Sequence, residues 1–342
     1  MNLSDLNKVA RALVAPGKGL LAADESSGTI KKRFDAIKVE STEHSRRDYR
    51  EMLFRSKDAM SNWISGVILY DETIWQKAAD GTALVKLIEQ AGAIPGIKVD
   101  EGTQPLANCP GELITAGLDQ LGTRLANYYK QGARFAKWRA VIDIGKDIPS
   151  MTAIHANAHA LARYAALCQD AQIVPIVEPE VLMDGDHDID RCYDVTARVL
   201  NKTFQELRLQ RVALEGMILK PNMVISGKKC PKQASVEEVA EKTIRVLKNC
   251  VPAAVPGIAF LSGGQSDEDA TAHLDAMNRI GGLPWPLTFS YGRALQAAPQ
   301  QAWSGKPENV AAGQQAFSHR ARMNSLASKG EWRSDLERQK AA

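Results

Sequence analysis

Short apolar runs recur along the chain and alternate with longer amphipathic stretches. The runs are apolar without a period of two, which is typical of strands buried on both faces of a parallel sheet. Each run therefore predicts one strand. The eight predicted strands cover residues 20–24, 66–70, 96–100, 135–142, 173–179, 216–221, 257–263 and 287–291.

The stretches between these runs carry apolar residues at helical spacing. Between residues 119 and 129, for example, Leu121, Leu125 and Tyr128 repeat at the period of one helix face. Ser235, followed three residues later by Glu238, is typical of a capping box at the start of a helix. The predicted helices include 119–129, 157–169, 190–207 and 235–247.

Eight strands that alternate with helices indicate a parallel α/β protein, and eight is the number that closes a (β/α)8 TIM barrel. An open doubly wound sheet is the alternative, although no GxGxxG motif stands between the first strand and its helix. No Pro-, Gly- or Ser-rich linker divides the chain, so we expect one barrel domain over 1–329 with helical extensions at both ends. The polar segment 330–342 is expected to be a mobile tail.

Composition narrows the classes of partner. Of 342 residues, 44% are apolar and 24% are charged, and the net charge of +3 is too small to indicate a nucleic-acid partner. We find no signal peptide and no apolar run of membrane-spanning length. The five cysteines are odd in number, widely spaced and free of CxxC motifs, which favours free thiols in a reducing, cytoplasmic compartment.

Lysines within or at the end of three separate strand-like runs are the first sign of chemistry. Lys220 ends the run 216–221 just before Pro221, and Lys98 and Lys137 lie in two other runs. One such lysine more often reaches from a strand end into solvent. Three of them instead indicate a cationic site that binds anions and lowers the pKa of one member, which is the condition for a Schiff-base nucleophile.

Carboxylates accompany these lysines. Glu178 and Glu180 are two residues apart on a predicted strand and therefore point to the same side, and Asp24 ends the first strand. If they face the barrel mouth, one serves as acid/base and another orients a lysine. Structural salt bridges to Lys137 or Arg139 are an equally good interpretation of the glutamate pair, and capping the next helix is the alternative for Asp24.

Two turns near the end of the predicted barrel suit a phosphate. In 262–264 two glycines let backbone amides approach an anion and Ser262 adds a hydroxyl, while Arg293 supplies a guanidinium at the end of 290–293. Loops after strands seven and eight form the usual phosphate site of such barrels. A further candidate is the helix N-terminus after the first strand, where the hydroxyls belong to Ser26, Ser27 and Thr29.

No metal or other cofactor is expected. His155 and His159 are four residues apart but lack the glutamate of an HExxH motif, so we expect them to lie on a helix surface without binding a metal. The acidic segment 184–188 lacks the spacing of an EF-hand loop.

Taken together, these segments closely resemble the class I fructose-1,6-bisphosphate aldolases, the metal-independent Schiff-base enzymes, from about residue 17 to residue 296. The segments that carry the resemblance are LAADES at 21–26, FAKWR at 135–139, VPIVEPE at 174–180, LKPN at 219–222, LSGGQS at 261–266 and SYGRAL at 290–295.

The resemblance implies reversible cleavage of fructose 1,6-bisphosphate to dihydroxyacetone phosphate and glyceraldehyde 3-phosphate in glycolysis and gluconeogenesis. It assigns the Schiff base to Lys220 and the acid/base role to Glu178. Glu180 would orient the lysines, and Asp24 and Lys137 would assist proton transfer and charge stabilisation.

The resemblance also implies two phosphate sites and an assembly, since family members are typically homotetramers. The residues toward the C1 phosphate would be Ser262, Gly263, Gly264, Ser290, Gly292 and Arg293. Those toward the C6 phosphate would be Ser26, Thr29, Arg33 and Lys98, with Arg139 also on the substrate. A catalytically silent sugar-phosphate-binding or scaffold barrel is the alternative, which the joint presence of Lys220, Glu178, Asp24 and Lys137 argues against.

One difference from the family concerns the end of the chain. Eukaryotic members typically end in a tyrosine that enters the site, whereas this sequence ends with Lys340, Ala341 and Ala342. We therefore expect Glu178, acting through a water, to protonate the enamine, and deletion of 330–342 to change turnover by less than about tenfold.

Overall fold

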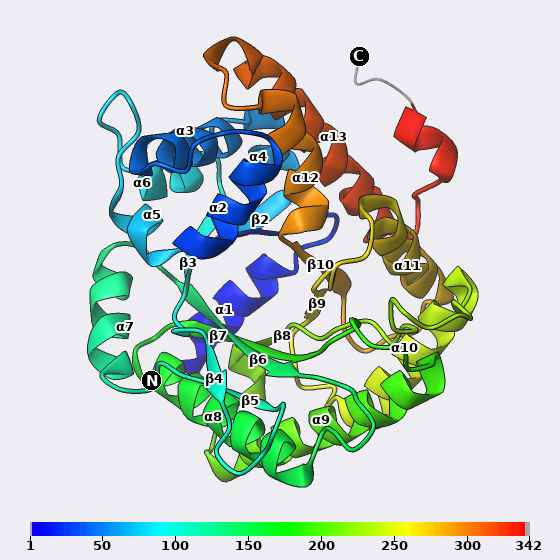
Figure 1. Ribbon diagram of the computed structural model, residues 1–342. Helices are drawn as coiled ribbons and strands as arrows, with labels where there is room; N and C mark the ends of the chain where they lie inside the picture. The colour runs from blue at the N-terminus through cyan, green and yellow to red at the C-terminus, as the bar shows by residue number, and fades with distance from the viewer. Residues whose placement is uncertain (1, 339–342) are drawn as a thin grey trace.

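The computed structural model describes residues 2–338, and these form a closed barrel of eight parallel strands with helices around it (Figure 1). Going round the barrel the order is β1-β10-β9-β8-β7-β6-β3-β2, and β1 closes the ring by pairing with both β2 and β10. The predicted TIM barrel is confirmed. Its strands are β1 (Gly19–Ala23), β2 (Ile64–Leu69), β3 (Ile94–Lys98), β6 (Phe135–Ile142), β7 (Val174–Val181), β8 (Ile218–Leu219), β9 (Ile258–Phe260) and β10 (Leu287–Tyr291).

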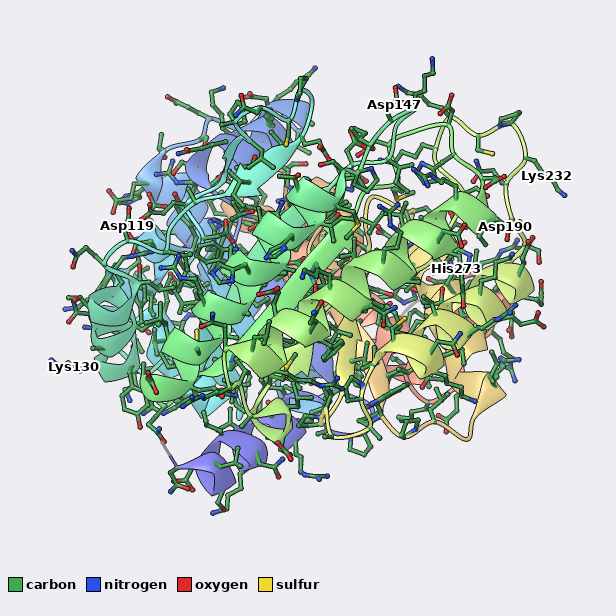
Figure 2. The ribbon with its side chains drawn as sticks, turned by 90° about the horizontal axis from the view of Figure 1, so that it is seen from below. Asp119, Lys130, Asp147, Asp190, Lys232 and His273 are labelled. Carbon is green, nitrogen blue, oxygen red and sulfur yellow. The ribbon has the colours of Figure 1, made fainter. Side chains whose placement is uncertain are left out.

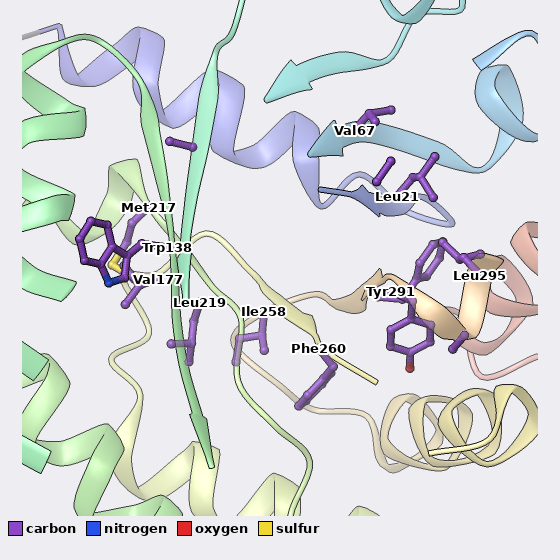
Figure 3. Packing of buried hydrophobic residues seen from close by; sticks show 14 of the residues in the cluster. Leu21, Val67, Trp138, Val177, Met217, Leu219, Ile258, Phe260, Tyr291 and Leu295 are labelled. Atoms are coloured by element: carbon purple, nitrogen blue, oxygen red, sulfur yellow. The ribbon is translucent and has the colours of Figure 1, made fainter. Parts of the chain in front are cut away.

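The strands lack alternation because both of their faces are buried. In β7 every residue is buried, including Glu178 and Glu180 among its apolar neighbours. Toward the helices, Trp138 of β6 stacks on Tyr164 with ring centroids 5.5 Å apart. Figure 3 shows this outer layer, to which Leu21, Val67 and Val177 of other strands also contribute.

The barrel interior is closed at one end by α1 (Leu3–Leu13). Leu6, Ala10 and Leu13 of this helix belong to one buried cluster with strand residues such as Phe135 and Val174. Gly96 makes room for the Phe135 ring, because a Cβ there would lie 2.3 Å from it. The amino-terminal end of the barrel is therefore packed, and the carboxyl ends of the strands face the other way.

Helices follow the strands, as expected for βα units. Ser235 caps α10 by accepting a hydrogen bond from the Glu238 amide, which is one of the two bonds of the predicted capping box. All four helices predicted from the sequence are present, as α7, α8, α9 and α10, with ends that differ by a few residues. The α-helices after α1 are α2 (Ser27–Ala36), α3 (Glu43–Phe54), α4 (Lys57–Asn62), α5 (Asp71–Trp75), α6 (Leu84–Gln90), α7 (Leu121–Lys130), α8 (Met151–Asp170), α9 (Ile189–Leu209), α10 (Val236–Cys250), α11 (Asp267–Ile280), α12 (Arg293–Trp303) and α13 (Val310–Ala327).

One element was not predicted. After β3 the chain forms an antiparallel hairpin of β4 (Thr103–Pro105) and β5 (Leu113–Thr115). All of β4 is exposed, so its sequence shows no apolar period, and each strand has three residues. A ladder this short leaves no hydrophobic pattern to read.

The segment after α13 lies against the barrel's helices up to residue 338. The Trp332 amide donates to Asp275 of α11, at 2.8 Å, and its indole donates to Glu337, at 3.0 Å. Glu337 also pairs with Arg320 of α13. The mobility of 330–342 stays a prediction, and residues 339–342 lie outside the described part of the chain. Within residues 2–338 no helix combines the length and apolar character needed to span a membrane.

Candidate active site

A cavity of about 360 Å³ lies at the carboxyl ends of the strands. Its wall contains nearly all the residues singled out in the sequence, contributed by segments that follow or end β1, β6, β7, β8, β9 and β10. The predicted residues that line it are Asp24, Ser26, Thr29, Arg33, Lys137, Arg139, Glu178, Glu180, Lys220, Ser262, Gly263, Gly264, Ser290, Gly292 and Arg293.

The strand register explains how distant residues meet. Lys137 and Arg139 are two residues apart on β6 and so face the same side, and Arg139 is the register partner of Glu178 on β7. Lys220 follows β8 directly, and its amide donates to the Val177 carbonyl at 2.8 Å. The three strands therefore present their polar side chains at one level of the mouth.

A chain of titratable side chains lines the cavity. Lys220 Nζ lies 3.2 Å from Glu178 Oε1, and Lys137 Nζ lies 3.3 Å from Glu178 Oε2. Lys137 Nζ also lies 2.7 Å from Asp24 Oδ2. The side chains of Lys220, Glu178 and Lys137 are at most 5% exposed, and that of Asp24 is 12% exposed. Charges shielded in this way interact strongly.

The pKa values of Asp24 and Lys137 follow from this pairing. Burial alone would raise the pKa of Asp24, but Lys137 and Lys220 outweigh burial and hold that pKa well below its usual range. Burial would lower the pKa of Lys137, but Asp24 and Glu178 outweigh it and hold that pKa well above its usual range. Asp24 and Lys137 are therefore both charged at neutral pH.

Two buried oxygen atoms in the cavity are unused. Glu178 Oε2 lies near Lys137, yet neither it nor Ser290 Oγ has a hydrogen-bond partner among the described residues. Buried polar atoms are normally paired with protein groups or water. These two are free to bind a substrate hydroxyl, a phosphate or a water.

Glu180 forms a salt bridge with Arg139, which is one of the interpretations that the sequence allows for the glutamate pair. Burial would lower the pKa of Arg139, but the charge of Glu180 outweighs burial and holds that pKa above its usual range. Among the described residues no lysine forms an ion pair with Glu180, because Lys137 is turned toward Asp24 and Glu178. The expected orienting of lysines by Glu180 is therefore not a direct contact.

The turn 262–264 has the backbone geometry of an anion site. Gly263 and Gly264 have φ angles of +57° and +87°, a region that residues with a Cβ rarely adopt. A Cβ on Gly264 would lie 2.5 Å from Arg293 Nη2, so the guanidinium comes directly against the glycine turn. With Ser290 Oγ unpaired nearby, donors gather at this corner, which we call the glycine corner (Ser262–Gly264, Ser290 and Arg293).

Another part of the wall is built by the first βα turn. Ser26 caps α2, accepting from the Thr29 amide, and the two hydroxyls lie 3.1 Å apart. Arg33, one turn further on, is held by the buried Glu25, which also binds the buried Arg50. Glu25 was missed in the sequence, where it reads as one more polar residue of the turn.

Lys98 is the predicted site residue that the structure does not bring to the cavity wall. Its ammonium lies 2.8 Å from Asp100 Oδ1 and donates to the Asp100 carbonyl. A carboxylate two residues along the same segment is the nearest partner, so it draws the side chain away from the mouth. Lys98 still contributes to the low pKa of Asp24 through its charge.

Several lining residues were not predicted. Lys228 and Asp184 come from the loops after β8 and β7, whose path no strand or helix pattern specifies. The other residues of this kind are Ala22, Glu25, Leu182 and Leu261.

The histidine pair lies elsewhere, on α8, against Glu206 of α9. Within residues 2–338 no group of three or more histidine, cysteine, aspartate or glutamate side chains is arranged to hold a metal ion.

Known proteins are similar to this chain over nearly its whole length. The family model for class I fructose-bisphosphate aldolase matches residues 5–342. A protein named probable fructose-bisphosphate aldolase class 1 from Xanthomonas campestris pv. campestris is 59% identical over 334 residues, which cover 97% of this chain and 100% of that protein. Fructose-bisphosphate aldolase 4, cytosolic, from Arabidopsis thaliana is 54% identical over 94% of this chain and 82% of its own length.

A solved structure agrees. Fructose-bisphosphate aldolase from Plasmodium falciparum, crystallised with TRAP and a small-molecule inhibitor, superimposes with a TM-score of 0.95 at 48% identity, covering 97% of this chain and 96% of that one. A family match over nearly the whole chain, on a barrel that gathers the expected lysines and carboxylates, places it without ambiguity. The chain belongs to the class I fructose-bisphosphate aldolase family.

Proposed function

We propose that this chain cleaves fructose 1,6-bisphosphate reversibly to dihydroxyacetone phosphate and glyceraldehyde 3-phosphate, with Lys220 as the Schiff-base nucleophile. The observation that carries this proposal is the contact between two buried side chains, Lys220 and Glu178, which lie 3.2 Å apart in a cavity of about 360 Å³. A neutral lysine amine adds to a ketone carbonyl, so the nucleophile needs a neighbouring base to take its proton.

Two buried lysines compete for this role, and their partners separate them. Lys137 contacts two carboxylates, Asp24 and Glu178, and its raised pKa keeps it protonated at neutral pH. Lys220 contacts Glu178 alone among the described carboxylates. Proton transfer from Lys220 to Glu178 leaves a free amine at Lys220, while Lys137 remains a fixed positive charge.

Glu178 then serves as acid and base in turn. The amine of Lys220 adds to the C2 carbonyl, and the carbinolamine loses its hydroxyl as water when Glu178 returns a proton, giving the iminium. Glu178 next takes the proton of the C4 hydroxyl, and the C3–C4 bond breaks with its electrons passing to the iminium nitrogen. Glyceraldehyde 3-phosphate leaves, and protonation of the enamine followed by hydrolysis frees dihydroxyacetone phosphate.

Lys137 and Asp24 hold the charges that this sequence of steps creates. The ammonium of Lys137 stabilises oxygen anions that develop on the substrate, because a fixed charge in a shielded site needs no reorganisation. Asp24 keeps Lys137 charged and in place. Arg139 and Glu180 form a second ion pair on the wall, within reach of the sugar chain.

Two groups of residues on the cavity wall suit the two phosphates. We assign the C1 phosphate to the glycine corner, where a guanidinium, free backbone amides and an unpaired hydroxyl suit a dianion. We assign the C6 phosphate to the first βα turn, with Ser26, Thr29 and Arg33.

Assembly and location are part of the proposal. We expect a homotetramer, as is typical of the family, and a cytoplasmic enzyme, in line with the cytosolic relative from Arabidopsis thaliana. Light scattering of the purified chain tests the assembly.

A cleavage assay on fructose 1,6-bisphosphate tests the activity and excludes a silent sugar-phosphate-binding barrel. The parent should turn over while Lys220→Met, with an equal melting temperature, should not. A parent that binds the bisphosphate without cleaving it would contradict the proposal.

A further inference from the structure

Lys228 lies at the cavity wall but has no role in the proposed reaction. It belongs to the loop that leads from β8 to α10. Two more lysines, Lys229 and Lys232, lie on the same loop, and neither lines the cavity. Figure 2 shows Lys232 projecting from the edge of the molecule. Of the three lysines on this loop, Lys228 is therefore the one that the backbone brings to the cavity.

The backbone around Lys228 is anchored. Its amide donates to the Met183 carbonyl at 2.7 Å, and the amides on either side donate to the His187 and Gly185 carbonyls. The two loops approach so closely that a Cβ on Gly227 would lie 2.3 Å from the Gly185 oxygen. This ladder fixes where the Lys228 side chain starts, independently of any contact that the ammonium makes.

The Lys228 ammonium reaches the glycine corner. A Cβ placed on Gly264 would lie 2.8 Å from Lys228 Nζ and 2.5 Å from Arg293 Nη2, so two cations approach the same point above the turn. In the part of the chain that the structure describes, Arg293 forms no ion pair. Two like charges so close repel each other, and an anion between them removes that cost.

Lys228 already has an anionic partner that a ligand can replace. Its ammonium lies 2.8 Å from Asp184 Oδ1, and the two side chains are 40% and 61% exposed. An ion pair this exposed contributes little, at most about 1 kcal/mol. A phosphate dianion that also binds Arg293 and the backbone amides competes well for the ammonium.

We propose that Lys228 is a further substrate-binding residue, which contacts the phosphate on C1 of the ketose together with Arg293 and the 262–264 turn. The assignment rests on the proposed aldolase function, and it adds a residue from the loop after β8 to a corner otherwise built by the loops after β9 and β10. The role is one of binding and not of chemistry, since the Lys228 ammonium lies between Asp184 and the glycine corner, while Lys220 pairs with Glu178.

Steady-state kinetics with two substrates test the proposal. Fructose 1-phosphate carries a phosphate at C1 alone, so Lys228→Gln should raise KM for it and for fructose 1,6-bisphosphate by the same factor, about fivefold to twentyfold, with kcat nearly unchanged. Lys228→Arg should restore most of the loss, because a guanidinium also binds phosphate. The matched control, Lys232→Gln, removes the same charge from the same loop and should leave both KM values unchanged.

The outcomes separate this inference from the proposed function. If the parent cleaves fructose 1,6-bisphosphate but Lys228→Gln and Lys232→Gln have the same KM, the function stands and the inference is wrong. A rise in KM for the bisphosphate alone would place Lys228 at the C6 end and overturn it too. A loss of kcat and melting temperature without a KM effect would make Lys228 a structural tether between the two loops.

Discussion

Lys137 and Asp24 form an ion pair at the mouth of the barrel, with 2.7 Å between Nζ and Oδ2 and little solvent around it. The pair fixes Lys137 as a permanent cation, and it leaves Lys220 as the lysine that can lose its proton to Glu178. A structural pair and a catalytic pair respond differently when one member, or both, is replaced by a neutral residue.

We expect Asp24→Asn to lose both activity and stability. It leaves Lys137 buried with one carboxylate fewer, and breaking a buried pair costs about 3–5 kcal/mol. The double variant Asp24→Asn/Lys137→Met should recover much of the stability and none of the activity. Chemical denaturation and kcat measure the two effects, and Asp35→Asn, whose partner Lys31 is exposed, is the surface control. Recovery of activity in the double variant would show that the pair serves the fold alone.

Glu178→Gln should lower kcat by about 10²–10⁴-fold with a small change in melting temperature, because the amide cannot exchange the protons of dehydration and cleavage. Glu206→Gln is the matched control. Glu206 is also a buried glutamate, but it pairs with His159 of α8 and with Lys202 of its own helix, α9. The Glu206→Gln variant should therefore have a lower melting temperature and an unchanged kcat per folded molecule. The same pattern in Glu178→Gln would mean that Glu178 is a structural residue.

Arg293→Ala should raise KM for fructose 1,6-bisphosphate strongly, since it removes the guanidinium from the glycine corner. The useful readout is discrimination, measured as the ratio of kcat/KM for the bisphosphate to that for unphosphorylated fructose. This ratio should fall. If the mutant discriminates between the two sugars as well as the parent does, Arg293 does not bind the phosphate.

His273 gives a pH dependence of stability. Burial holds its pKa below the usual value near 6.5, despite nearby Asp269 and Glu237, and its Nδ1 lies 2.6 Å from Gln265 Oε1. Below about pH 6.5 the unfolded chain therefore binds more protons at this residue than the folded one, and stability falls as the pH falls. His273→Gln should lose less melting temperature between pH 7 and pH 5 than the parent does. The exposed His44 supplies the control variant, and equal losses in all three proteins would contradict this account.

Much of the barrel could be predicted because its strands are apolar on both faces. Each of the eight runs overlaps one barrel strand, and residues at strand ends such as Asp24 and Lys220 are placed by the fold alone. The register of β6 and β7 then places Arg139 beside Glu178, which no local pattern states. The β4–β5 hairpin, with its exposed first strand, has no such pattern, and it was missed.

The remainder of the site depends on side-chain partners and loop packing. Lys98 appears equivalent to Lys137 in sequence, yet Asp100 binds its ammonium. Lys228 appears as a solvated loop lysine, and a backbone ladder between two loops brings it to the cavity. Both outcomes are set by contacts between segments that have no regular period.

The central claim is that Lys220, and not the equally buried Lys137, forms the Schiff base. The most direct measurement is reduction with borohydride in the presence of dihydroxyacetone phosphate, followed by mass mapping of the labelled peptide. We expect inactivation that requires both reagents, with one label on Lys220 and none on Lys137, and activity that a chelator does not reduce. A label on Lys137, or inactivation without any labelled lysine, would contradict the account.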